Sequence, residues 1–381
     1  MEEKIEARLL RVAEAAKPTI LSRTRELVEI ESPSSSAEAV NRATALVAEW
    51  CRTLGARVRL HRSKGYGDSL EARFGPVRSK LAPILLLGHL DTVWDHGTLK
   101  TMPWSVKNGR VSGPGVLDMK AGVAMAITAI EMLLEECLLQ RPVILLLHAD
   151  EEIGSPGSRT LTEKIAAACS AVYVLEPAQG PEGAYKTARK GVGLFELKVQ
   201  GIASHAGVDF AAGHSAVLEL AWQLESIAAL TNLKTGVTVN PGLIHGGTRS
   251  NVVAAEAEAV IDVRIPRVRD GVQIERRLRA LKPRDKACSL MLTGEINRPP
   301  MERGRGTVAL FRRAQKAARD MGFVLTEAAT GGGSDGNFTA GLGIPTLDGM
   351  GAVGGGAHAV TEHLQESCLA PRTALLACMM L

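Results

Sequence analysis

Four short apolar runs in the sequence end in, or soon lead to, side chains that can bind a metal or move a proton. The first run stops at His89 and Asp91, and on an extended chain positions i and i+2 project to the same face. It is short, uncharged and bounded by Pro83 and Gly88, which is typical of a buried parallel strand. If the four runs share one sheet, their ends converge on one rim, where open α/β sheets build active sites. The residues that follow the runs are His89 and Asp91, then Asp150, Glu151 and Glu152, then Glu176, and finally His358.

Together with Asp118, this set consists mostly of carboxylates, with two imidazoles and no thiol. Carboxylates crowded on one rim repel one another unless cations neutralise them. Oxygen and imidazole ligands suit divalent zinc, cobalt or manganese, and the absence of cysteine argues against a closed structural zinc site. Two metals about 3.5–4 Å apart need a bridging carboxylate, as in some aminopeptidases. Taken alone, Asp118 could instead cap the next helix, and Asp150–Glu152 could be a solvated turn.

Glu151 and Glu152 are expected to divide two tasks. Neighbouring side chains at a strand end point in different directions. One carboxylate can therefore bind metal while the other faces a water molecule activated by the metal. The second carboxylate can accept the proton of the water and later pass it to a leaving amine.

The elements that must position these residues follow an α/β pattern. Two amphipathic helices are expected between Glu2 and about Gly55, with Ser36 as the N-cap of the second. Val58–Phe74 reads as a strand, a turn and a return strand, whereas Thr92–Gly115 reads as a long irregular loop. An Ala- and Met-rich helix follows from Lys120, with Gly122 near its start. Strands alternating with helices predict parallel crossovers.

The pattern changes at about Thr187, where strands begin to alternate apolar and polar residues, as in Val260–Ile265. The predicted order β-α-β-β-α-β is that of the ferredoxin-like motif. We therefore expect a catalytic domain made of residues 1–186 and 298–381, with a separate domain, 187–297, inserted in it.

The composition restricts the class of protein. The chain has 381 residues, a formal net charge of +4 and 45% hydrophobic residues, as expected for a globular protein. Aromatic residues are only 3%, so basic stretches such as 267–284 read as solvated helix faces and not as nucleic-acid-binding surfaces. Six cysteines without CxxC spacing indicate a reducing compartment. No apolar leader or membrane-length segment is visible, so we expect a cytoplasmic protein without a membrane partner.

Five separated motifs in this order resemble one known family. They are Gly88–Thr92, Gly115–Gly122, Asp150–Glu152, Gly201–Gly207 and Gly331–Asp335. The chain is similar to the metallopeptidases related to acetylornithine deacetylase and succinyl-diaminopimelate desuccinylase, and within them to the glutamate carboxypeptidase (carboxypeptidase G) branch. The resemblance extends from about Leu81 to Leu364. It implies a three-layer catalytic domain with a mostly parallel sheet and an inserted ferredoxin-like lid and dimerisation domain.

The resemblance also implies the metal site, with two zinc ions per subunit that cobalt or manganese could replace. Asp118 would bridge the two ions, and Glu151 would be the general base and acid. Asp91 would hold the ring of the histidine that binds metal two residues earlier, a common arrangement for a metal-bound imidazole. The remaining ligands would be His89 and Glu176 at one ion and Glu152 and His358 at the other.

For the substrate, the resemblance implies that His205 reaches the active site of a partner subunit in a homodimer and helps to polarise the scissile carbonyl. Arg264 has the planar fork that grips a terminal carboxylate, although it could also be a charge on the wet face of the sheet. The other predicted substrate contacts are Asn251, Arg298, and the backbone of Gly332 and Gly333.

The sequence therefore predicts a dinuclear zinc hydrolase that cleaves an amide next to a free carboxylate and releases a C-terminal amino acid such as glutamate. The expected substrate is a small peptide or an N-acyl amino acid. Two alternatives stay open: an N-acyl-amino-acid deacylase with the same machinery, and a catalytically silent member that binds a metal or peptide.

Overall fold

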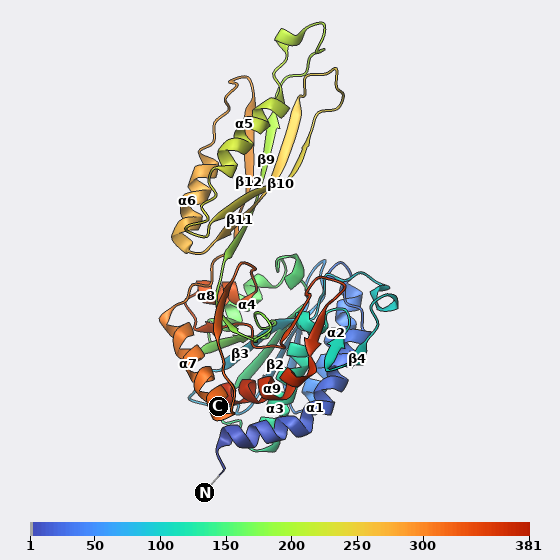
Figure 1. Cartoon of the computed structure of the whole chain (residues 1–381), viewed down its shortest axis with the longest axis vertical. Helices are drawn as coiled ribbons and strands as arrows, with labels where there is room; N and C mark the ends of the chain where they lie inside the picture. Colours follow the sequence, from blue (N-terminus) through green and yellow to red (C-terminus); the bar gives the residue numbers. More distant parts are fainter. Residues whose placement is uncertain (1–2) are drawn as a thin grey trace. The chain divides into compact units, whose positions relative to one another are not determined.

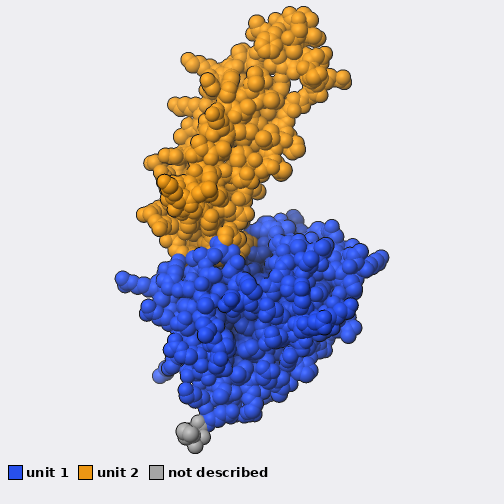
Figure 2. All heavy atoms as spheres, in the orientation of Figure 1, with its two compact units in different colours: residues 1–188, 303–330, 334–381 blue, residues 189–302, 331–333 orange. Residues whose placement is uncertain are grey.

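The computed structural model describes residues 3–381, which form two compact units (Figure 2). Among the described residues, unit 1 comprises 3–188, 303–330 and 334–381, and unit 2 comprises 189–302 and 331–333. The domain boundaries at residues 187 and 297 stay a prediction.

Unit 1 is built on a six-stranded sheet with the order β1-β2-β6-β3-β7-β14. The neighbours β6, β3, β7 and β14 are parallel, whereas β1 and β2 run antiparallel along one edge. All four apolar runs therefore lie side by side in one sheet, as predicted. The strands are β1 (Arg57–His61), β2 (Ser69–Phe74), β3 (Ile84–His89), β6 (Val143–His148), β7 (Ala171–Val174) and β14 (Thr346–Leu347).

Helices cover both faces of this sheet, because the central strands are apolar on both sides. Alternate residues such as Leu86 belong to the large core formed with α1, α3 and α9, whereas Leu85 and Leu87 belong to a smaller core beneath α4. The helices α1, α3 and α9 also pack on one another (Figure 1). The predicted three-layer α/β fold is confirmed. The helices of unit 1 are α1 (Ile5–Glu29), α2 (Ala37–Thr53), α3 (Ala121–Glu135), α4 (Arg159–Ala166), α7 (Arg305–Asp320), α8 (Gly336–Gly341) and α9 (Leu369–Met380).

Two helices begin with the local sequence features that were expected there, a capping serine and a glycine. Ser36 caps α2 by accepting a hydrogen bond from the backbone N–H of Ala39 at 3.4 Å. Gly122, at the start of α3, lies so close to β7 that a Cβ there would be 2.2 Å from the carbonyl oxygen of Leu175. Only glycine allows α3 to reach the end of β7, the strand that leads into Glu176.

The long stretch 92–115 is more ordered than the sequence predicts. It contains a hairpin of β4 (Ser105–Lys107) and β5 (Arg110–Ser112). Late in the chain, β15 (Gly354–Gly355) and β16 (His363–Gln365) complete this second, four-stranded sheet, in which β5 pairs with β16. The pairing joins distant segments, so the local sequence carries little trace of it. A short two-stranded sheet joins β8 (Tyr185–Arg189) to β13 (Glu327–Thr330).

Unit 2 contains the predicted β-α-β-β-α-β order. Its sheet is antiparallel with the order β10-β11-β9-β12, the ferredoxin-like arrangement. Its core is formed by alternate strand residues such as Phe195 and Ile261 together with Leu220 and Leu278 of the helices. The elements are β9 (Gly191–Gln200), α5 (Ala216–Ala228), β10 (Thr238–Gly246), β11 (Glu256–Ile265), α6 (Val268–Arg279) and β12 (Ser289–Arg298). Between residues 3 and 381, no helix has the length and apolar character needed to cross a bilayer.

Candidate metal centre

The rim formed by the carboxyl ends of β3, β6 and β7 brings the predicted ligands together. β3 lies between β6 and β7, so the residues after these strands meet at adjacent positions. His89 is the last residue of β3, Glu152 lies in a 3₁₀ turn (Glu151–Ile153) just after β6, and Glu176 follows β7 by two residues. His358 comes from the loop between β15 and β16 and has a left-handed backbone with φ of 62°.

Two groups of potential metal ligands share Asp118. His89, Asp118 and Glu176 form one group, and Asp118, Glu152 and His358 form the other, with the ligand atoms of each group within 4.8 Å of one another. These five residues are the ones predicted from the sequence to bind metal.

The two histidines approach opposite oxygens of the shared carboxylate. Nε2 of His89 lies 3.4 Å from Oδ1 of Asp118 and 3.6 Å from a carboxylate oxygen of Glu176. Nε2 of His358 lies 3.4 Å from Oδ2 of Asp118 and 3.2 Å from Glu152. This is the arrangement in which one carboxylate can bridge two cations.

Asp118 does not cap a helix, the alternative considered for it. It lies in the irregular segment Val116–Lys120, and α3, which begins at Ala121, has no side-chain cap. Its carboxylate is thus available to the two ligand groups.

The residues present fit a pair of divalent cations. Three of their polar atoms are buried and have no hydrogen-bond partner within residues 3–381, namely Nε2 of His89, Oδ1 of Asp118 and Oε1 of Glu152. Buried polar atoms are rarely left unpaired in native proteins, so these three call for a ligand. Nitrogen and oxygen donors without sulfur are the set preferred by zinc, cobalt or manganese in open sites.

The charges at the rim shift the pKa of each group. Burial lowers the pKa of His89, but the neighbouring carboxylates of Asp118, Asp91 and Glu176 outweigh it and hold this pKa well above its usual range. Hydrogen bonds to Asp118 and Glu152 raise the pKa of His358 to about 10. Burial raises the pKa of Glu152 to about 7, whereas the pKa of Asp118 is lowered by both histidines despite its burial. The crowded carboxylates at this rim therefore stabilise positively charged groups beside them.

Asp91 holds more than the ring of His89. Nδ1 of His89 lies 2.9 Å from the backbone carbonyl oxygen of Asp91 and 3.4 Å from its carboxylate. The two carboxylate oxygens accept the backbone N–H groups of Glu151 at 3.2 Å and Glu152 at 3.1 Å, and the hydroxyl of Ser34 donates at 2.7 Å. One buried carboxylate therefore ties the end of β3 to the turn that follows β6.

Glu151, which is also buried, lies outside both ligand groups.

The residue that holds the Asp118 segment, Glu362, is not among the site residues predicted from the sequence. Glu362 is 1% exposed and accepts the backbone N–H groups of Gly115 at 3.0 Å, Leu117 at 2.8 Å and Asp118 at 3.1 Å. The indole N–H of Trp94 is its fourth donor, at 2.8 Å. Its position four residues after His358 is the only signal in the sequence, and that signal does not reveal the partners.

Unit 2 holds the predicted substrate residues in two separate groups. Arg264 and Arg298 lie on the strands on either side of β9, each opposite Val192, and a Cβ on Gly333 would be 3.2 Å from Cδ of Arg298. Backbone carbonyls of Gly332 and Gly333 accept hydrogen bonds from Arg189 at 3.2 and 3.0 Å. These residues gather at the start of β9.

The second group lies beyond the other end of β9. The backbone of His205 bridges Val252, and the backbone N–H of Ala206 donates to the carbonyl oxygen of Asn251 at 2.9 Å. Val192 and Gln200 are about eight residue steps of ~3.3 Å apart, so the two groups are separated by roughly 26 Å along the strand.

Arg264, which is predicted to hold the carboxylate of the substrate, already pairs with a carboxylate of its own strand. Nε of Arg264 donates to Asp262 at 2.9 Å and Nη2 donates to the same carboxylate at 2.8 Å. This ion pair is consistent with the alternative that Arg264 is a charged residue on the wet face of the sheet. The role of Arg264 in substrate binding stays a prediction.

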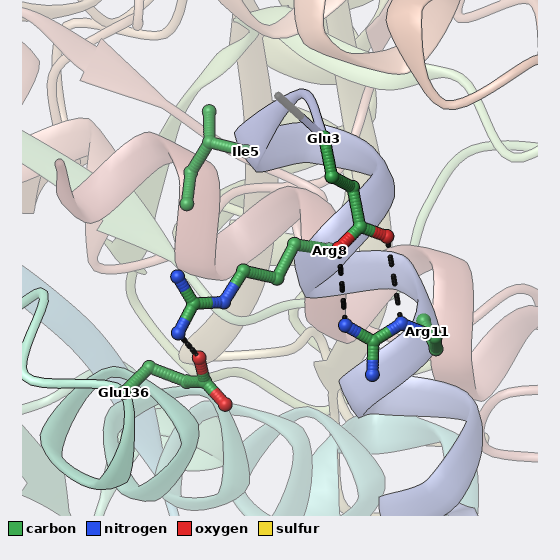
Figure 3. Close-up of a pocket in the computed structure, with 5 residues that line it drawn as sticks. All are labelled: Glu3, Ile5, Arg8, Arg11 and Glu136. Carbon is green, nitrogen blue, oxygen red and sulfur yellow. Dashed lines mark hydrogen bonds and ion pairs between the residues drawn. The ribbon is translucent and has the colours of Figure 1, made fainter. Parts of the chain in front are cut away.

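The hollow drawn in Figure 3 is separate from this centre. It lies beside α1 and the end of α3, and its charged residues pair with one another, Arg8 with Glu136 and Arg11 with Glu3. It shares no residue with the two ligand groups.

Comparisons with known proteins agree with this fold. The model of the peptidase family M20/M25/M40 matches residues 85–381. The chain therefore belongs to this family of metal-dependent peptidases, and the family resemblance inferred from the sequence motifs is confirmed. Carboxypeptidase G2 of Pseudomonas sp. (strain RS-16) is 27% identical over 377 residues, which cover 97% of this chain and 90% of that protein.

Solved structures share the fold over nearly the whole chain. Aminopeptidase PepT from Bacillus cereus superposes with a TM-score of 0.80 at 22% identity, covering 96% of this chain and 98% of that one. The M20 family metallo-carboxypeptidase Sso-CP2 from Sulfolobus solfataricus has a TM-score of 0.74 at 18% identity, covering 95% and 98%. At these identities the structures support the fold alone.

Proposed function

We propose that the chain is a dinuclear zinc hydrolase that cleaves an amide bond next to a free carboxylate and releases a C-terminal amino acid such as glutamate. The observation that carries this proposal is the pair of ligand groups joined at Asp118. A bound pair of divalent ions would supply a Lewis acid for a carbonyl oxygen and make a nearby water molecule more acidic. Cobalt or manganese would be acceptable substitutes for zinc.

We assign the protein residues distinct tasks around this centre. His89 and Glu176 would bind one ion, Glu152 and His358 the other, and Asp118 both. Glu151 would accept a proton from water at its carboxylate and later donate it to the leaving amine, as a general base and then a general acid. Asp91 supports this role because it holds the backbone N–H of Glu151 and the ring of His89.

The relative and the arginines support the proposed substrate class. Carboxypeptidase G2 matches almost the full chain, and Arg264 and Arg298 present cations at one end of the unit 2 sheet. A guanidinium group can hold a carboxylate through two parallel hydrogen bonds. We propose that these arginines, with the backbone of Gly332 and Gly333, receive the terminal carboxylate.

We also propose that the active protein is a homodimer formed through unit 2. His205 and Asn251 lie roughly 26 Å along β9 from the arginine end, so the two groups of one subunit can hardly grip the same small substrate. A dimer removes this difficulty, because His205 and Asn251 of one subunit would serve the active site of the other.

A metal analysis combined with a substrate panel tests the function. The purified protein is loaded with zinc, and release of amino acid is measured from peptidyl-glutamates, other peptides and N-acyl amino acids. We expect two zinc ions per chain and preferential release of a C-terminal amino acid from peptidyl substrates. Preference for short N-acyl groups would instead indicate a deacylase. Metal binding without turnover of any compound would indicate a silent member, and absence of metal at the five ligands would refute the proposal.

A further inference from the structure

One face of the six-stranded sheet is only partly covered. The helix α4 packs on Ile144 and Leu146 of β6, whereas β2 presents Arg73 and Glu71 directly opposite these two residues and so on the same face. The face continues onto β1, the edge strand, which adds Arg57, Arg59 and His61. With Lys164 of α4, these side chains line a pocket of about 490 Å³.

The register places like charges opposite each other. Arg57 faces Arg73 across the antiparallel pair of β1 and β2, a destabilising arrangement unless an anion lies between them. Arg59 faces Glu71, but this carboxylate is occupied elsewhere. One of its oxygens accepts from Nε of Arg73, and the other lies 2.6 Å from Nε2 of His61.

The pocket therefore has an excess of positive charge. Four basic side chains, Arg57, Arg59, Arg73 and Lys164, surround one carboxylate. Among residues 3–381, no carboxylate forms an ion pair with Arg57, Arg59 or Lys164. Leu161 and Ile165 of α4 add an apolar wall, and the lower dielectric beside it strengthens the attraction for a negative charge.

We propose that this pocket binds a small anion that carries a dianionic phosphate group. A guanidinium matches the geometry of phosphate oxygens through paired hydrogen bonds, and phosphate between Arg57 and Arg73 would convert their repulsion into attraction. The volume is in the range of small-molecule pockets, and no Phe, Tyr or Trp side chain lines it to stack on a base. None of its lining residues belongs to either metal-ligand group, so the site is independent of the proposed hydrolysis.

The test compares three zinc-loaded proteins by calorimetric titration. They are the wild type, R57S/R59S in the pocket, and R25S/R42S on α1 and α2 as a control. The control removes the same charge from exposed arginines that already pair with Glu29 and Glu38. Glycerol 3-phosphate and inorganic phosphate are the probes, and sodium chloride at equal ionic strength serves as the blank. Any phosphate bound by the zinc ions is common to all three proteins and cancels in the comparison.

We expect a saturable binding component in the wild type and in R25S/R42S that weakens by roughly tenfold or more in R57S/R59S. The unfolding midpoint should rise with the probe in the first two proteins and much less in the third, because a ligand of the native state stabilises it. Equal binding of both probes would assign recognition to the phosphate group alone, and a preference for the ester would add contacts to its organic part. Identical isotherms for the three proteins, or an equal effect of chloride, would overturn the proposal.

Discussion

Oε1 of Glu362 accepts a hydrogen bond from the backbone N–H of Asp118 at 3.1 Å, so a buried carboxylate from one ligand loop holds the residue shared by both ligand groups. The same oxygen accepts from Leu117, and Oε2 accepts from Gly115 and Trp94. The position of Asp118 therefore depends on four hydrogen bonds made by a residue that is not itself a ligand.

Replacing Glu362 with Gln should weaken metal binding. The amide keeps one acceptor oxygen but directs an NH₂ group at backbone donors, and loss of such outer partners typically lowers metal affinity about 10–100-fold. Competition with a chromophoric chelator measures this affinity. Glu31→Gln is the matched control, because Glu31 also accepts two backbone N–H groups, from Gly97 and Leu99, but in a loop without ligands. Equal zinc affinity in both variants would show that Glu362 does not position the site.

Substitution of the two adjacent glutamates should have different effects on turnover and on zinc content. Glu151→Gln is expected to lower turnover by a factor of about 10²–10⁴ or more while zinc content stays near the wild-type value, because Glu151 acts on protons and lies outside the ligand groups. Glu152→Gln should instead lower zinc content. Elemental analysis and turnover are measured on the same samples. Wild-type turnover in Glu151→Gln would remove this residue from the mechanism.

Mixing two inactive variants tests whether His205 of one subunit serves the active site of the other. In a hybrid of Glu151→Gln and His205→Ala, one active site contains an intact Glu151 from its own chain and an intact His205 from its partner. Activity should therefore return when the two variants are dissociated together and reassociated, as followed by substrate turnover. If His205 serves its own chain, neither site of the hybrid is complete and the mixture stays inactive.

Arg264 should matter only for substrates with a free carboxylate. Arg264→Met is expected to lower kcat/KM for peptidyl-glutamate by about tenfold to a hundredfold, the loss of a charged hydrogen bond of about 1.5–3 kcal/mol, and to leave esterified substrates nearly unchanged. Arg264→Lys keeps the charge but loses the planar fork, so it separates the two contributions. An equal loss on acid and ester would assign Arg264 to its contact with Asp262 in the sheet.

His148 should make the metal-free protein sensitive to acid. It is buried between the hydroxyls of Ser69 and Thr162, and burial lowers its pKa to about 3 from 6.5. The unfolded chain takes up a proton below pH 6.5 while the folded state does not until about pH 3, so folded stability falls by about 1.4 kcal/mol per pH unit across this window.

The variant His148→Gln removes this titration. Between pH 6.5 and 5 it should lose about 2 kcal/mol less stability than the wild type, as measured by urea unfolding with chelator present. His96→Gln, in the exposed loop after β3, is the control and should follow the wild type. Parallel stability curves for His148→Gln and the wild type would contradict a neutral, buried His148.

The parts of the site that could be predicted from the sequence are those encoded by local patterns. Continuous apolar runs such as 84–88 and 143–147 identify strands buried on both faces, and the polar residue that ends each run marks the rim. His89 and Glu152 were found in this way, and the alternating pattern of 260–265 revealed the second sheet.

The parts that could not be predicted depend on partners distant in the sequence. The β4–β5 hairpin consists of three-residue strands whose pairing with β16 has no local signature. The donors of Glu362 lie more than 240 positions away, and the contact of Asp91 with the N–H of Glu151 appears only once β3 and β6 are neighbours. The cross-strand pair of Arg57 and Arg73 likewise depends on a register that composition does not reveal.

The packing of α1 on α9 sets an order of events during synthesis of the chain. Leu9 of α1 and Leu376 of α9 lie in the same core, so this layer cannot close until residue 376 has left the ribosome. Unit 2, by contrast, is made almost entirely of one continuous segment and has its own core. Unit 2 can therefore fold first, while the segments that carry the candidate metal centre wait for α9 to emerge.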